Sequence, residues 1–269
     1  MSELRSVAVR IAREAAELAR TRRAQGVEVV ATKSSEIDIV TATDRETEDL
    51  VRARLAELRP GDAILGEEGG QTFGDTDVTW IVDPIDGTVN FLYGIPQYAV
   101  SIAARRRNRA GDDQVVAGAV VNAATGETYS AALGEGATLD GRPIAVRPAP
   151  PMPQRLIATG FWYVHDVRVR QGEAVARLLT HVRDIRRMGS CALDLCAVAA
   201  GSLDGYVEEG PAPWDYSAGG LIATEAGARL ELHRGTSGHD TVVCAPEAGF
   251  DEFLAVVRGA GFLEFGAGE

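Results

Sequence analysis

Acidic residues gather in two short stretches in the first third of the chain, residues 66–68 and 80–88, and at one position far downstream. These acids are Glu67, Glu68, Asp83, Asp86 and Asp215. Hard carboxylate oxygens supplied by three chain segments suit a divalent metal such as Mg²⁺. Gly87 and Thr88 follow the two aspartates directly, and their backbone N–H groups could hold a phosphate beside the metals. The pattern predicts metal-assisted hydrolysis of a phosphate ester.

The run Asp83-Pro84-Ile85-Asp86 predicts a tight turn in which both carboxylates face one cavity. Pro84 fixes its own φ and disfavours the interior of a strand or helix. The carbonyl of Ile85 could join the two carboxylates as a ligand. A surface turn would explain either aspartate-containing dipeptide alone, but it explains poorly a run that follows directly on an apolar strand.

At other candidate positions, a structural role such as helix capping can explain the residue without any chemical role. Asp215 would make a good N-cap for a helix over 215–227, and both roles can hold at once because a helix N-terminus facing a polar cavity suits a ligand. Capping alone explains Asp44, and a surface position explains Lys33. Glu67 and Glu68 stand out only because they lie near the aspartate turn.

The sequence offers no covalent nucleophile and no histidine metal site. The four histidines lack the spacing of a metal-binding pair, and the serines at 190 and 217 lack the surroundings of a nucleophile elbow. This favours direct attack by metal-bound water. Cys191, Cys196 and Cys244 have no paired spacing, so we expect buried, reduced thiols in a cytoplasmic protein.

The composition is typical of a soluble globular protein, with 269 residues of which 45% are apolar and 25% charged. The formal charge of −12 disfavours a nucleic-acid partner, and the basic patch at 105–107 predicts only a solvated strand end. The first residues lack the apolar run of a signal peptide, and no stretch has the length of a membrane span. We expect neither a nucleic acid nor a membrane as partner.

The elements that would position these residues fall on either side of a proline-rich seam at 148–153. Before it, the apolar spacing predicts a helix from Leu4 to Gly26 and a second helix that starts near Thr43, with Glu46 completing a capping box, and runs to Pro60. Between them, residues 27–43 predict extended chain or a hairpin arm. Further strands are expected at 79–82, 98–105, 115–121 and 128–132.

After the seam, predicted strands alternate with predicted helices. The strands are 155–160, 184–187, 205–209 and 241–245, and the helices are 170–182, 190–201, 215–227 and 249–258. This alternation predicts an α/β half over about residues 151–269, packed against an α+β half over about residues 1–150.

Taken in order, the motifs resemble those of the inositol monophosphatases, a lithium-sensitive, Mg²⁺-dependent family of phosphatases. The matching segments are residues 33–35, 38–44, 66–68, 80–91 and 214–227. They cover nearly the whole length and are most like those of the bacterial members. The resemblance implies an α+β fold, a layered α-β-α-β-α sandwich of the inositol monophosphatase and fructose bisphosphatase type. It also implies a single unit over residues 1–269 and a homodimer.

The resemblance further implies a role for each matching residue. The first Mg²⁺ would be held by Glu67, Asp83 and the carbonyl of Ile85. The second would be held by Asp83, Asp86 and Asp215, and a third, weaker Mg²⁺ would share Glu67. The catalytic residues would be Asp44, Glu67 and Thr88, with Asp44 and Thr88 forming a relay that deprotonates the attacking water. The substrate-binding residues would be Asp86, Gly87, Thr88, Cys191, Glu208 and Asp215.

The implied activity is hydrolysis of myo-inositol monophosphate by direct attack of a metal-activated water. Glu208 favours a polyhydroxylated leaving group, because a carboxylate can accept hydrogen bonds from two hydroxyls. The proline-rich stretch 209–213 leaves histidinol phosphate and fructose bisphosphate open as alternative substrates. A regulatory binding protein with incidental activity is a further alternative, which the intact ligand set disfavours. A structural Ca²⁺ site is disfavoured because EF-hand spacing is absent.

Overall fold

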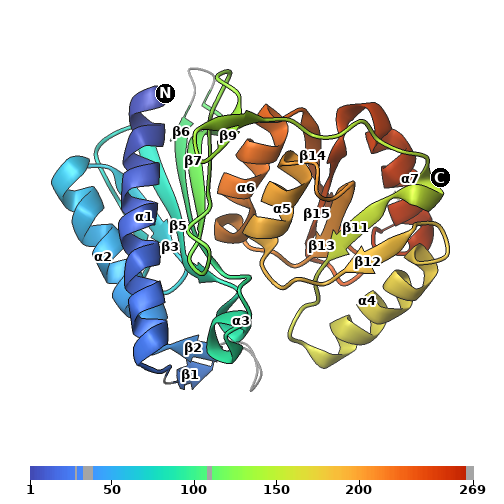
Figure 1. Cartoon of the computed structure of the whole chain (residues 1–269), viewed down its shortest axis with the longest axis horizontal. Coiled ribbons are helices and arrows are strands. Elements are labelled where there is room, and N and C mark those ends of the chain that lie inside the picture. The colour runs from blue at the N-terminus through green and yellow to red at the C-terminus, as the bar shows by residue number, and fades with distance from the viewer. Residues whose placement is uncertain (28, 33–38, 108–110, 265–269) are drawn as a thin grey trace.

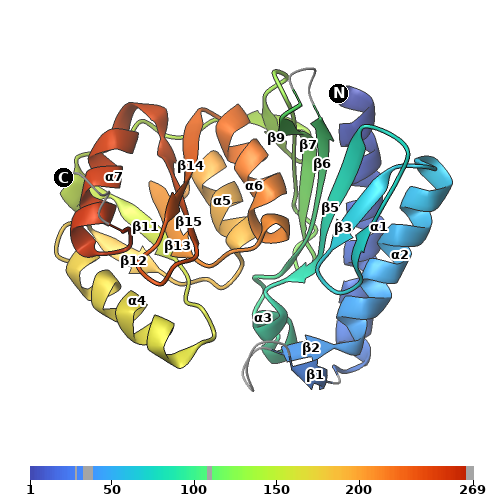
Figure 2. The same ribbon diagram turned by 180° about the vertical axis from the view of Figure 1, so that it is seen from behind.

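Two large β-sheets separated by helices form the frame of the molecule (Figures 1 and 2). The structure is a computed structural model, and it describes residues 1–27, 29–32, 39–107 and 111–264. From one side to the other, the helical layers are formed by α1 (Ser2–Gln25) with α2 (Ala42–Leu58), α5 (Cys191–Ala199) with α6 (Pro213–Glu225), and α4 (His165–Leu178) with α7 (Phe250–Ala260). The sheets lie between these layers. The α-β-α-β-α order confirms the predicted α+β layered sandwich.

The larger sheet has eight strands and is antiparallel except for one parallel pair, β3 with β5. In spatial order its strands are β10 (Arg142–Ile144), β9 (Ala137–Leu139), β8 (Thr128–Ala132), β7 (Asp113–Asn122), β6 (Ala99–Arg107), β5 (Val78–Asp86), β3 (Ala63–Gly66) and β4 (Gly70–Thr72). Helices cover both faces of its central strands, so β6 and β7 are apolar in near-continuous runs instead of alternating.

The smaller sheet has five strands and mixes parallel with antiparallel pairs. Its spatial order is β12 (Asp184–Arg186), β11 (Leu156–Thr159), β13 (Gly205–Glu209), β15 (Asp240–Pro246) and β14 (Ala228–Arg234). Strand β11 runs parallel to both of its neighbours, whereas β15 is antiparallel to both of its own. Two short 3-10 turns, Met152–Gln154 and Glu247–Gly249, precede β11 and α7.

Three apolar clusters fill the spaces between successive layers. One joins α1 and α2 to the larger sheet, one surrounds α5 and α6 between the sheets, and one joins α4 and α7 to the smaller sheet. Burial of this apolar surface is the main favourable contribution to folding. As expected, Cys191, Cys196 and Cys244 are buried free thiols. Within the described residues, no helix combines the length and apolar character needed to cross a membrane.

The end of the first helix was predicted well, whereas the starts of two helices and both bounds of the helix expected over 170–182, which spans His165–Leu178, were predicted wrongly. The first helix ends at Gly26, as expected. The second begins with Thr41 as its N-cap, so the capping box proposed for Thr43 and Glu46 is wrong. Asp215 is likewise not an N-cap, because α6 starts two residues earlier, after Ala212. In both cases an acid is the third helical residue, where its carboxylate reaches back to the N-cap backbone.

Several short elements were not predicted. Strands β3, β4, β9 and β10 span only three or four residues each, too few for a period to be recognised. Strand β14 was missed although Leu230 and Leu232 alternate with charged residues, so the strictly alternating pattern expected after the seam is wrong there. The predicted arm forms a pair of short strands, β1 (Val29–Thr32) and β2 (Ile39–Thr41). Residues 33–38, which include Lys33, Ser34, Ser35 and Asp38, lie outside the described residues.

Candidate metal centre and substrate pocket

A cavity of about 310 Å³ lies where the two halves of the chain meet. One side is formed by the end of β5 and the short helix α3 (Thr88–Tyr93), and the other by segments that leave the smaller sheet. The predicted site residues that line it are Glu67, Asp83, Ile85, Asp86, Gly87, Thr88, Cys191, Glu208 and Asp215. Segments far apart in the sequence therefore contribute to one cavity.

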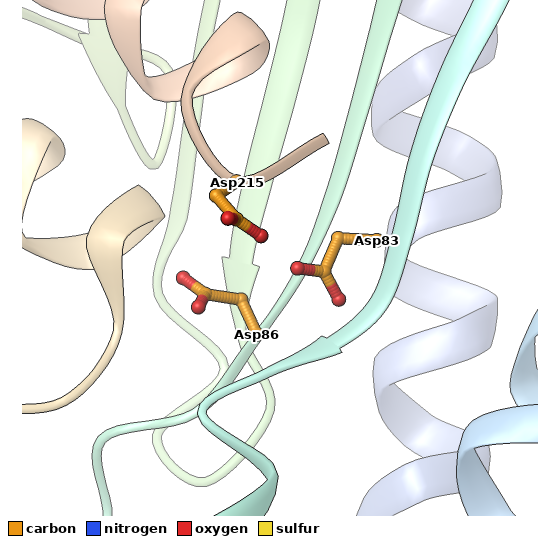
Figure 3. A group of neighbouring side chains, drawn as sticks. All are labelled: Asp83, Asp86 and Asp215. Carbon is orange, nitrogen blue, oxygen red and sulfur yellow. The ribbon is translucent and has the colours of Figure 1, made fainter. Parts of the chain in front are cut away.

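Three aspartates converge at one end of this cavity. Asp83, Asp86 and Asp215 each offer a carboxylate oxygen, and these oxygens all lie within 4.8 Å of one another. Figure 3 shows Asp83 and Asp86 from β5 and Asp215 from the first turn of α6, with the three side chains gathered close together. Three converging carboxylates are a donor set that suits a divalent cation.

A β-bulge explains how Asp83 and Asp86 come to the same side. Residues three apart in a regular strand point to opposite faces. The pairing of β5 with β6 shifts between Asp83, opposite Ser101, and Asp86, opposite Ala99, so an extra residue is accommodated. Pro84 lies in this irregular stretch, where its missing N–H costs no regular ladder bond. The strand thus continues past 82, where it was expected to end, and carries both acids to the cavity.

Strand register brings Glu67 beside Asp83. Strands β3 and β5 are parallel, with Gly66 opposite Val82, and the N–H of Glu67 donates to the carbonyl of Val82 at 3.2 Å. Glu67 lines the cavity but is not part of the compact group of three aspartates. The N–H of Glu68 is turned to the buried Glu48, donating to its Oε2 at 2.8 Å.

Helix N-termini stabilise three of the acids, of which Asp44 and Asp86 are buried and Asp215 is half-buried. Asp44 accepts the N–H of Thr41 at 2.9 Å at the start of α2, and Asp215 accepts the N–H of Ala212 at 2.6 Å at the start of α6. Asp86 accepts the N–H of Ala192 at 2.7 Å at the start of α5. Backbone donors and the positive end of the helix dipole both favour a carboxylate at these places.

Ser190 is a site residue that the sequence analysis missed. It is the N-cap of α5, and its hydroxyl donates to Asp86 Oδ2 at 2.5 Å. The signal that could have identified it was its position at the start of the helix predicted over 190–201, where serine is a favoured cap. Together with the Ala192 N–H, it fixes one oxygen of Asp86 in place.

Thr88 links the cavity to the buried carboxylate of Asp44. The Thr88 hydroxyl lies 3.0 Å from Asp44 Oδ1 and 3.1 Å from the carbonyl oxygen of Ile85. Asp44 is fully buried and lies behind Thr88, outside the lining of the cavity. The two predicted relay residues are thus in direct hydrogen-bond contact.

Gly87 occupies a conformation that requires glycine. Its φ is +94°, and a Cβ at this position would lie 2.9 Å from the carbonyl oxygen of Gln97 and 3.0 Å from that of Gly189. Gly87 is also the N-cap of α3, so the first backbone N–H groups of α3 have no partner within the helix. A compact turn therefore passes close to the aspartates.

Burial and mutual repulsion disfavour the charged forms of these acids. Burial raises the pKa of Asp86 to about 6 and also raises the pKa of Asp44. The pKa of Asp215 is raised well above its ordinary value by burial first, and then by the negative charges of Asp86 and Glu67. A bound divalent cation would neutralise this crowding. The residues present therefore fit a divalent metal.

The rest of the cavity lining has a different character. It is formed by the segment 160–163, by Arg187, by Cys191 and by residues 208–212. Trp162 stacks on His239 with ring centroids 3.9 Å apart, and its backbone N–H donates to Gln171 Oε1 at 2.8 Å. The aromatic segment and Arg187 were not predicted, because nothing in their local spacing indicates that they reach the cavity.

Comparison with known proteins agrees with this fold and site. Residues 1–258 match the model of the inositol monophosphatase family. The inositol-1-monophosphatase SuhB of Mycobacterium tuberculosis is 47% identical, with 98% of this chain and 96% of the relative covered. A protein of Vibrio cholerae named Nus factor SuhB is 37% identical, with coverages of 85% and 84%.

A solved structure of Mycobacterium tuberculosis SuhB superimposes with a TM-score of 0.83, at 47% identity and with 98% of each chain covered. The layered fold and the phosphatase class expected from the motifs are thereby confirmed. This chain belongs to the inositol monophosphatase family.

Proposed function

We propose that this protein is a Mg²⁺-dependent phosphomonoesterase that hydrolyses myo-inositol monophosphate to inositol and phosphate. The observation that carries the proposal is the convergence of Asp83, Asp86 and Asp215 beside the turn at Gly87 and Thr88. That arrangement offers a cation site next to backbone N–H groups that can bind phosphate oxygens.

Two to three Mg²⁺ ions would be held by the carboxylates at this end of the cavity. Glu67, Asp83 and the carbonyl of Ile85 would hold one. Asp83, Asp86 and Asp215 would hold another, and a third would share Glu67. When bound, these ions supply Lewis acidity, which lowers the pKa of the attacking water and neutralises charge on the phosphoryl group.

The protein's own contribution to proton transfer would be the pair Thr88 and Asp44. Thr88 Oγ1 would accept a proton from the attacking water while its own hydrogen passes to Asp44 Oδ1, which lies 3.0 Å away. Burial raises the pKa of Asp44, so this carboxylate is a stronger base than an exposed aspartate. The Thr41 N–H donates to the other carboxylate oxygen of Asp44, Oδ2, and this hydrogen bond keeps Asp44 Oδ1 directed at Thr88.

The leaving group would occupy the end of the cavity that holds Glu208 and the start of α5 at Cys191. A carboxylate accepts hydrogen bonds from hydroxyls, so this end suits a polyol leaving group such as inositol. Fructose bisphosphate is the competing substrate, because Arg187 lines the same end and could accept a second phosphate.

The test is Mg²⁺-dependent phosphate release from inositol monophosphate, histidinol phosphate, fructose bisphosphate and a nucleotide bisphosphate, each with and without lithium. We expect the highest rate on inositol monophosphate and inhibition by lithium, as in the family that the motifs resemble. A dominant rate on another ester would contradict the substrate but not the metal chemistry. The absence of release from all four would contradict the proposed activity.

A regulatory role is a second candidate, favoured by the relative named Nus factor SuhB at 37% identity. Binding of partner proteins from the source cell to the wild type and to Asp83→Asn would separate the two functions. Partner binding that survives loss of catalysis would indicate a function independent of hydrolysis.

Assembly and location complete the proposal. We propose a homodimer, which light scattering after size-exclusion chromatography would test. Cytoplasmic location is consistent with three buried, unpaired cysteines.

A further inference from the structure

The carboxylate of Glu208 is enclosed on two sides by residues that the proposed mechanism does not use. Glu208 lines the leaving-group end of the cavity and is half-buried. Such a carboxylate selects among substrates only if it is held in one position, because each rotamer lost on binding costs free energy. Its neighbours therefore bear on the choice of substrate.

Tyr206 supplies the first constraint. Residues two apart in a strand share a face, so Tyr206 and Glu208 of β13 point the same way. The Tyr206 hydroxyl donates to Glu208 Oε2 at 2.6 Å, and the tyrosine is fully buried. Burial first, and then the nearby Cys191 thiol and the negative charge of Glu208, raise the pKa of Tyr206 well above its ordinary value, so the phenol remains a donor. A hydrogen bond to an ionised acceptor is among the stronger kinds.

Gly160 supplies the second constraint. Strands β11 and β13 are parallel, with Thr159 opposite Val207, so Gly160 directly follows the last paired residue and lies beside Glu208. A Cβ on Gly160 would lie 2.0 to 2.2 Å from the carboxylate atoms of Glu208. The carboxylate therefore packs against bare backbone, and any side chain at 160 would displace it.

We propose that Tyr206 and Gly160 are positioning residues that hold the Glu208 carboxylate, with Oε2 bound by Tyr206, so that Oε1 is presented to a hydroxyl of a polyol leaving group. This inference rests on the proposed function and adds the means of selecting the leaving group. An oriented acceptor discriminates strongly, because a leaving group without the matching hydroxyl leaves a buried acceptor unpaired.

The first test is the kinetics of Tyr206→Phe on two substrates, inositol monophosphate and p-nitrophenyl phosphate, whose leaving group carries no further hydroxyl. We expect kcat/KM for inositol monophosphate to fall about tenfold, mainly through KM, and that for p-nitrophenyl phosphate to change less than about twofold. Tyr129→Phe, on strand β8 away from the cavity, is the matched control and should alter neither. Thermal melting of each variant verifies folding.

A double-mutant cycle distinguishes positioning from a general structural effect. If Tyr206 acts through Glu208, Tyr206→Phe should cause no further loss in a Glu208→Ala background. Gly160→Ala should reproduce the loss that is selective for inositol monophosphate, without removing any polar group.

Two results would overturn the inference. If the wild type hydrolyses both substrates and Tyr206→Phe lowers kcat/KM for both by the same factor, the positioning role is contradicted while the proposed function remains intact. A wild type that hydrolyses p-nitrophenyl phosphate but not inositol monophosphate would contradict both the proposed substrate and the selection of a polyol.

Discussion

The two ends of the cavity are built in different ways. At the metal end, Asp44, Asp86 and Asp215 each accept a backbone N–H at a helix N-terminus, and a bulge in β5 turns Asp83 and Asp86 together. At the leaving-group end, the lining comes from the end of β13 and from segments that follow strands of the smaller sheet, and it includes aromatic rings, the carboxylates of Glu208 and Glu209 and the guanidinium of Arg187.

From this difference we propose that chemistry and substrate selection depend on separate parts of the frame. The carboxylates at the metal end are held by regular elements that cannot shift without disturbing the layers. At the other end, residues 160–163 and 210–212 lie outside helices and strands, where side chains can change at little cost to the core. Variants at each end test this separation, and the largest effect is expected at the metal end.

Removing a carboxylate from the metal end should abolish catalysis. We expect Asp83→Asn to lower kcat by about a thousandfold or more and to weaken Mg²⁺ binding, because Asp83 is proposed to contribute to both principal ion sites. Phosphate release and calorimetric Mg²⁺ titration measure the two effects. Asp77→Asn is the control, because Asp77 is an exposed acid directly before the same strand and forms an ion pair with Arg106. An active Asp83→Asn enzyme would contradict the metal assignment.

Breaking the relay should impair turnover without removing the metals. Thr88→Ala should lower kcat by about a hundredfold, because the contact between the cavity and Asp44 is lost. Mg²⁺ affinity should remain within about twofold. Thr88→Ser keeps the hydroxyl and should retain most activity. Equal losses in the alanine and serine variants would argue for packing instead of proton transfer.

The stability of the metal-free protein should depend on pH through Asp86. Its pKa is about 6 in the folded state and 3.8 ordinarily, so between these values the folded state holds a proton that the unfolded state lacks. Stability is therefore lost as pH rises from about 4 to about 6, by about 3 kcal/mol for this group.

Urea unfolding of metal-free wild type and Asp86→Asn at pH 4 and pH 7 would measure this loss. The wild type should lose more stability than the variant, and saturating Mg²⁺ at pH 7 should restore it. Parallel behaviour of the two proteins would contradict the role assigned to burial of Asp86.

The smallest effect is expected at the leaving-group end. Arg187→Ala should lower kcat/KM for inositol monophosphate by less than about threefold, because this substrate has no second phosphate. Any activity on fructose bisphosphate should fall further, by about tenfold. Arg186→Ala, the neighbouring exposed arginine that pairs with Asp184, is the matched control. Equal losses on both esters would place Arg187 outside substrate selection.

Motifs alone were sufficient to predict much of the metal end. Asp83, Asp86, Gly87 and Thr88 are close in the chain, so their residue types and spacing are enough to indicate a turn that bears ligands. The long helices were also predictable, because their apolar periodicity extends over several turns. The positions of Asp44 and Asp215 within their helices were not, since neighbouring residues offer equally plausible caps.

By itself, the sequence determined the aspartate turn and indicated metal-assisted phosphate chemistry, because these depend on residue types that are close in the chain. The layered fold was predicted only through the resemblance of motifs along the whole chain to those of a known family. Only the tertiary structure decided that Tyr206, Gly160 and Glu208 meet and that Ser190 holds Asp86. Those contacts depend on strand register and on which helix ends face the cavity. Both result from packing between distant segments, for which a single sequence carries no local signal.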